Sequence, residues 1–170
     1  MVSATKPTVG YSVGWVREFL QRGSGLALDE NQASVVAALA ERKLIDLFDV
    51  ATTTALVNGR AKIFRHDLPL TKGLQHELAE AERLAGELEL QPLLVFLADA
   101  GVPGPIDDSM RDDVPRLMAA LLLLAARIIA ILEPANVGTE ERLGRLLRRE
   151  PLHPTPWELE RASRVLDLTV

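Results

Sequence analysis

Arg60 and Asp67 are the strongest candidate pair for a specific interaction in the sequence. They flank a short stretch, Lys62 to Arg65, that predicts a lone strand, and Asp67 is expected to open the following helix. A guanidinium can donate two parallel hydrogen bonds to a carboxylate, and a carboxylate at a helix start accepts free backbone N–H groups. We therefore predict a structural ion pair that also caps a helix, with a DNA-facing loop as the alternative.

Basic residues gather around this loop and are the possible nucleic-acid contacts: Arg60, Lys62, Arg65 and Lys72. A solvated surface is the simpler interpretation of such a cluster. The net charge of −5 also disfavours DNA, because non-specific DNA binding depends on neutralising phosphates.

A second basic segment, 138–149, predicts an amphipathic helix in which Arg142, Arg145, Arg148 and Arg149 accompany three leucines. It could bind an acidic partner, nucleic acid or an anionic surface. The simpler interpretation is a leucine face on the core with the arginines in water. Arg148 and Arg149 remain possible nucleic-acid contacts.

Residues typical of catalysis or metal binding are few. The three histidines, His66, His76 and His153, show no paired metal-ligand spacing, and there is no cysteine. No phosphate-binding glycine loop or nucleophile motif is present. We therefore expect no catalytic, cofactor-binding or metal-binding residues, and a small helical enzyme is only a remote alternative.

The composition is that of a soluble helical domain. Of the 170 residues 48% are hydrophobic but only 4% are aromatic, so aliphatic side chains must form the core. The apolar run 117–132 would span about 24 Å as a helix, against about 30 Å for a bilayer core, and it contains Arg127. We therefore predict that this run forms a buried helix and does not span a membrane. We expect a cytoplasmic protein, which would be associated with the nucleoid if it binds DNA.

Apolar periodicity predicts seven helices. Five of them cover residues 13–21, 30–57, 91–100, 138–149 and 155–168. Another begins at Asp67 and ends between 82 and 87, and the last begins between 108 and 113 and ends at 132. Asp29 is the expected cap of the second helix, and Thr155 with Glu158 forms a capping box for the last. Pro115 either belongs to the first turns of its helix or kinks it.

The two halves of the chain share one order of elements: a short helix, a long helix and another helix. The long helix of the first half is about 40 Å in length, too long for one small neighbour to cover. We therefore expect a single domain of two units, about 13–87 and about 88–170, whose long helices cross and cover each other. The basic segment near 138–149 is an insertion in the second unit.

Three stretches, "NGRAKIFRHDLPLTKGLQ", "ELELQPLLVFLA" and "ELERASRVLDL", resemble a bacterial family of unknown function that fuses two histone folds in one chain. The similarity covers roughly Val13 to Leu168. It implies an all-α histone fold, with two helix-strand-helix units in a handshake pseudodimer and Arg60 clamping Asp67. Two departures are the longer segment 137–154 and the lack of an Arg/Asp pair in the second unit.

The resemblance also implies how the lone strand is paired. Lys62 to Phe64 should lie beside Gly104 to Ile106, and Leu26 to Leu28 near Leu152-His153. Asp107 and Asp108 would then oppose DNA at the basic loop. The expected function is non-enzymatic: a structural or protein-interaction module that binds a protein partner or self-associates, with a DNA-binding, histone-like protein as the alternative.

Overall fold

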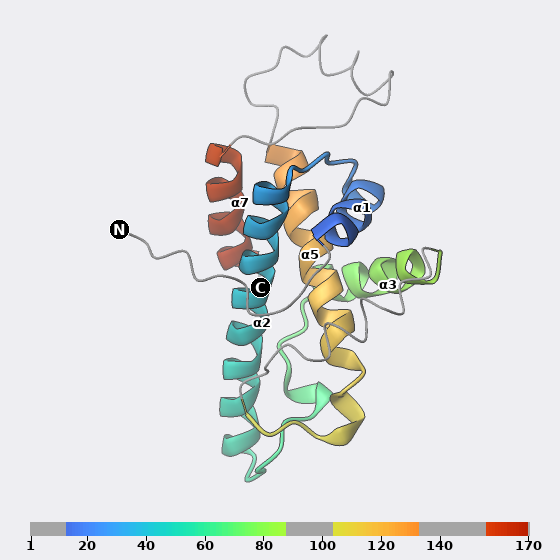
Figure 1. Ribbon diagram of the computed structural model, residues 1–170. Helices are drawn as coiled ribbons and strands as arrows, with labels where there is room; N and C mark the ends of the chain where they lie inside the picture. Colours follow the sequence, from blue (N-terminus) through green and yellow to red (C-terminus); the bar gives the residue numbers. More distant parts are fainter. Residues whose placement is uncertain (1–12, 88–103, 133–155, 170) are drawn as a thin grey trace.

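The computed structural model describes residues 13–87, 104–132 and 156–169, and these are mostly helical (Figure 1). The elements are α1 (Val13–Ser24), α2 (Glu30–Val57), the 3-10 turn η1 (Arg65–Asp67), α3 (Lys72–Glu87), the 3-10 turn η2 (Asp108–Met110), α5 (Asp113–Leu132) and α7 (Pro156–Thr169). The all-α prediction is confirmed at this level.

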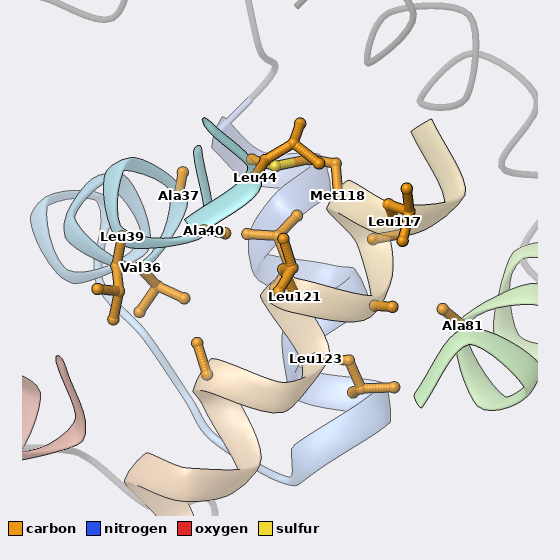
Figure 2. Close-up of a cluster of buried hydrophobic side chains, with 14 of the residues drawn as sticks. Val36, Ala37, Leu39, Ala40, Leu44, Ala81, Leu117, Met118, Leu121 and Leu123 are labelled. Atoms are coloured by element: carbon orange, nitrogen blue, oxygen red, sulfur yellow. The ribbon is translucent and has the colours of Figure 1, made fainter. Parts of the chain in front are cut away.

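Helix α5 is the centre of the molecule, in contact with α1, α2, α3 and α7. Between Leu117 and Ile129 its apolar side chains are buried or half-buried on all sides, as the apolar run predicted. Met118, Leu121 and Leu123 have no exposed surface (Figure 2). A helix that is apolar around its whole circumference must be surrounded by other elements. The core therefore sits along α5.

One helical segment of the described residues, Asp108–Ile131, is long and apolar enough to cross a membrane by length and composition alone. Two-thirds of its most apolar window, 67%, is buried inside the protein. A core helix passes the same test, so the segment gives only weak support to a membrane span.

The helices of the two halves interlock. Helix α3, from the first half, packs against α5 of the second half, and α7, from the second half, packs against both α5 and α2. The two long helices α2 and α5 also contact each other. Figure 1 shows α7 and α3 on opposite sides of this central pair. Each long helix is thus covered by elements from both halves.

Helix α2 begins and ends where the sequence predicts. The Asp29 side chain accepts a hydrogen bond from the backbone N–H of Gln32, whose own side chain accepts one from the Asp29 N–H (2.8 and 2.9 Å). This reciprocal capping box satisfies two donors that have no partner within the helix. At the other end Gly59 has a φ of 69°, which a glycine adopts without strain, and the chain turns.

The predicted pairing of the two loops is present. Ile63 forms an isolated parallel bridge with Ile106, through Ile63 N–H to the Pro105 carbonyl (2.9 Å) and Asp107 N–H to the Ile63 carbonyl (3.0 Å). The predicted strand is shortened to this bridge, because the chain enters the turn η1 at Arg65. The other predicted pairing, with Leu152-His153, lies outside the described residues.

The predicted start of α3 is wrong. Asp67 closes the turn η1, and α3 begins five residues later at Lys72. Pro69 explains the delay, because a residue before proline avoids helical backbone angles, and Leu68 is extended (φ −72°, ψ 133°). The hydroxyl of Thr71 then accepts the N–H of Leu74 (3.3 Å) at the start of the helix.

Helix α1 continues past its predicted end at Gln21. Gly23 lies inside the helix, where an added Cβ would overlap Leu123 Cδ1 of α5 and stand 3.1 Å from Leu84 Cδ1 of α3. Gly25, with a φ of 75°, follows the end of the helix. Gly23 is therefore needed for close packing of three helices and not for a turn.

The remaining predicted helices agree with the structure wherever it describes their residues. Helix α5 begins at Asp113, so Pro115 stands in its first turn, where a backbone N–H has no partner within the helix. Helix α7 begins at Pro156. The predicted helices over 91–100 and 138–149 and the cap Thr155 lie outside the described residues, as does the side chain of Glu158.

Arg127 is the charged residue within the apolar run 117–132 of α5, and it joins three helices. Its Nη1 donates to Glu77 Oε1 of α3 (2.8 Å), its Nη2 lies 3.7 Å from Glu80 Oε2, and its Nε donates to the Gly23 carbonyl at the end of α1 (3.4 Å). The Glu77 side chain is only 8% exposed, and its Oε2 is buried without a hydrogen-bond partner. The pair holds α3 in one position on α5.

We predict that Gly23→Ala destabilises the protein by about 1–2 kcal/mol, because overpacking at Leu123 outweighs the gain in helix propensity. Gly86→Ala in α3 is the matched control, since a Cβ added at Gly86 would have nothing within 4 Å. It should be neutral or stabilise by up to about 1 kcal/mol. Urea unfolding of both variants measures the difference, and equal effects would contradict the close packing at Gly23.

We predict that Arg127→Met costs about 3 kcal/mol or more in unfolding free energy, because Glu77 is then a buried charge without its partner. The double variant Glu77→Leu/Arg127→Met should recover much of this loss, since it removes both charges. Thermal and urea unfolding of the single and double variants provide the measurement. A double variant less stable than Arg127→Met would mean that the pair does not act as a unit.

Candidate interaction site around the Arg60–Asp67 ion pair

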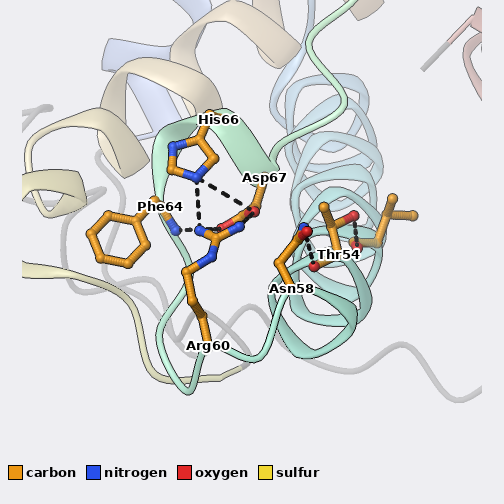
Figure 3. A network of polar contacts seen from close by, with 7 residues as sticks. Thr54, Asn58, Arg60, Phe64, His66 and Asp67 are labelled. Atoms are coloured by element: carbon orange, nitrogen blue, oxygen red, sulfur yellow. Dashed lines mark hydrogen bonds and ion pairs between the residues drawn. The ribbon is translucent and has the colours of Figure 1, made fainter.

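The Arg60 and Asp67 side chains form the predicted pair with two parallel hydrogen bonds (Figure 3). Arg60 Nη1 donates to Asp67 Oδ2 (2.7 Å) and Nη2 to Oδ1 (2.5 Å). Oδ2 also accepts the backbone N–H of Phe64 (2.9 Å). The Asp67 side chain is fully buried and the Arg60 side chain is 26% exposed. This bidentate geometry ties the loop after α2 to the turn η1.

Two rings complete the surroundings of the Arg60 guanidinium. The Phe64 ring centroid lies 5.5 Å from Arg60 Cζ, within cation–π range. His66 stacks on Phe64 with centroids 5.7 Å apart, and its Nε2 lies 2.7 Å from Arg60 Nη1. The guanidinium is thus in contact with Asp67, Phe64 and His66 of its own loop.

The ion pair lowers the pKa of Asp67 below its ordinary value of 3.8. Burial acts in the opposite direction, but the hydrogen bonds from Arg60 and from the Phe64 N–H, together with the Arg60 charge, outweigh it. Asp67 is therefore ionised at neutral pH, as the pairing requires.

Arg65 has an acidic partner from the second half of the chain. Its Nη1 donates to Asp113 Oδ1 at the start of α5 (3.0 Å). Arg116 lies 4.0 Å from the same carboxylate oxygen and 3.4 Å from Glu82 Oε1 of α3. The mostly buried Asp113 carboxylate and the more exposed Arg65, Arg116 and Glu82 thus bring opposite charges together from η1, α5 and α3.

The other predicted phosphate contacts differ in their surroundings. Lys62 is exposed, and its charge contributes to lowering the pKa of Asp107, after the hydrogen bonds from Ser109. Lys72 is exposed at the first residue of α3. Arg148 and Arg149 lie outside the described residues. The loop pairing brings Asp107 and Asp113 to the basic cluster, so its surface is of mixed charge.

A shallow depression beside this cluster has an apolar floor and a charged rim. Its interior space is about 10 Å³, room for about one water, which is far below the volume of a small-molecule site. The lining residues are Arg65, Leu68, Leu70, Leu78, Glu82, Asp113, Arg116 and Leu117. Among the described residues, no group of three or more histidine or acidic side chains is placed to hold a metal ion.

Sequence reasoning missed two of the interactions that organise this part of the molecule. Glu77 was not singled out, although Arg127 within an apolar run was a sign that a buried acid must exist elsewhere. Asp113 was expected only near a helix start, and its partner Arg65 stands 48 positions earlier. Neither spacing follows a local pattern.

A family model described as "Domain of unknown function (DUF1931)" matches residues 16–148. The chain belongs to this family. The match spans both halves, including α2, the ion pair and α5. A comparison with curated proteins gave no match.

Two solved structures resemble this DUF1931 protein over nearly its full length. A protein of Thermus thermophilus is 28% identical, with a TM-score of 0.69 over 94% of this chain and 98% of the other. Protein AQ328 of Aquifex aeolicus is 18% identical, with a TM-score of 0.65 over 92% of this chain and 94% of the other. The second likeness shows the fold alone.

We predict that the Asp67 ion pair makes stability depend on pH in the acid range. Because its pKa is lower in the folded protein than the ordinary 3.8, the contribution is fully present above about pH 4–5 and is lost as pH falls through the folded pKa. Asp67→Asn removes this dependence. The difference in melting temperature between wild type and variant should therefore be constant near neutrality and shrink below about pH 4. A difference that is unchanged in acid would contradict the lowered pKa.

Proposed function

We propose that the chain consists of two histone folds in a handshake pseudodimer and acts as a non-enzymatic protein-interaction module in the cytoplasm. The observation that carries the fold proposal is the parallel pairing of Ile63 with Ile106. It joins the loop after one long helix, α2, to the loop before the other, α5. In a histone pair the two protomers meet in this way.

The packing of the helices supports the same arrangement. The long helices contact each other, and the third helix of the first unit, α3, lies against the long helix of the second. The Arg60–Asp67 pair occupies the position of the histone clamp between the second loop and the third helix. In this protein the clamp closes the turn η1 before α3 begins.

The surface supports protein interaction more than catalysis or DNA binding. Of the six large apolar side chains that are exposed among the described residues, five belong to α2: Val35, Ile45, Val50, Leu56 and Val57. Exposed apolar side chains that gather in one patch mark protein contact surfaces, and Val35, Ile45 and Leu56 lie on one side of α2. The basic residues near the loop, in contrast, face acidic groups of their own chain: Arg60 faces Asp67, Arg65 faces Asp113, and Lys62 influences Asp107.

DNA binding is the alternative that a direct experiment separates from this proposal. Duplex DNA binding is measured against salt for wild type and for Lys62→Glu/Arg65→Glu. Our proposal predicts no appreciable binding in dilute buffer for either protein. Binding by wild type that falls steeply with salt and falls further in the variant would instead support a histone-like DNA-binding protein.

A matched control is Arg22→Glu/Arg164→Glu, which changes the net charge equally at two other exposed arginines, 55% and 77% exposed on α1 and α7. If both double variants weakened DNA binding alike, the effect would come from net charge and not from the loop.

A further inference from the structure

The outer face of α2 presents apolar and charged side chains in steps of three and four residues. Val35, Ala38, Arg42, Ile45 and Asp49 follow this spacing, and Leu56 continues it seven residues later. Val35, Ile45 and Leu56 are 51%, 44% and 65% exposed, so the stripe is apolar at both ends and in the middle. Residues with this spacing lie on one side of a helix, the geometry that another helix can pack against.

The stripe is symmetric about a point between Ile45 and Asp46. Arg42 and Asp49 stand equally far from this point, one on each side, and so do Val35 and Leu56. If two such helices cross antiparallel at this point, Arg42 of each copy meets Asp49 of the other. Val35 of each copy then meets Leu56 of the other, and the two Ile45 side chains lie at the axis. The pattern is complementary to itself, which a two-fold dimer requires.

The charges of this face are placed for such a contact. Among the described residues no hydrogen bond or ion pair reaches the Asp49 carboxylate, so it is available to a partner cation. Asp46 near the axis already has a cation, Lys43, at 3.1 Å, which reduces repulsion between the two copies. The Arg42 side chain is exposed, and it donates a hydrogen bond to the Ser163 hydroxyl of α7 (2.9 Å).

We propose that this face of α2 binds the same face of a second copy of the chain, antiparallel, with Arg42–Asp49 ion pairs formed twice. The proposal rests on the proposed interaction function and names the partner. The stripe from Val35 to Leu56 is about 31 Å long, and a contact of one helix face is at the small end of stable interfaces. The dimer is therefore concentration-dependent.

Sedimentation equilibrium of the full chain over a wide concentration range tests the proposal. Wild type should show a reversible monomer–dimer equilibrium. Asp49→Arg should raise the dimer dissociation constant at least about tenfold, because two pairs of like charges then face each other. Arg42→Glu/Asp49→Arg should return the constant toward the wild-type value, since the pairs form again with reversed sign. Asp108→Arg, the same charge change at a carboxylate 77% exposed on η2, should leave it unchanged.

Circular dichroism and thermal unfolding of each variant show whether it is folded, so loss of dimer is separated from loss of structure. A chain that stays monomeric at every concentration overturns the proposal. A dimer that Asp49→Arg does not weaken, or that the charge swap does not restore, overturns the α2 contact but leaves the interaction function standing. Salt-dependent DNA binding by the basic loop is the result that contradicts the interaction function itself.

Discussion

The structure depends on the need to cover α5 on every side. A helix with apolar side chains around its whole circumference cannot face water on any stripe, and each fully buried aliphatic side chain contributes about 1.5–3 kcal/mol before the entropy of ordering is counted. One half of this chain has too few elements to enclose such a helix. The enclosing helices α1, α2, α3 and α7 come from both halves, so the two halves fold as one body.

This constraint also explains where the buried charges lie. Arg127 interrupts the apolar surface of α5, and its position there is tolerated because Glu77 and the Gly23 carbonyl supply acceptors from two different helices. An ion pair in a core adds little net stability, but breaking it leaves a costly unpaired charge. The pair therefore specifies how α3 and the end of α1 sit on α5, a geometry that apolar packing alone leaves less defined.

In the loop around Arg60, at the surface, basic side chains are likewise paired with acidic ones. The basic residues that suggested phosphate binding lie next to acidic side chains of the second half of the chain. The pairing of Ile63 with Ile106 brings Asp107 and Asp113 close to these basic residues. A mixed-charge surface attracts a polyanion weakly. Helix α2 differs, since it turns its inner face to the core and leaves apolar side chains outward. The contrast between these two surfaces is the basis of our proposal of protein contacts for this member of the DUF1931 family.

The amino-acid sequence by itself determined the features that depend on neighbours along the chain. The Asp29 cap, the length of α2 and the buried run of α5 follow from spacings of a few residues. The resemblance to a fused histone pair added the Arg60–Asp67 clamp and the contact between the loops near Ile63 and Ile106. Only the tertiary structure decided that Gly23 lies inside a helix against Leu123, that Glu77 pairs with Arg127, and that Arg65 pairs with Asp113. These contacts join residues 48 to 100 positions apart, and such distances leave no periodic trace because the partners meet only after the helices have packed.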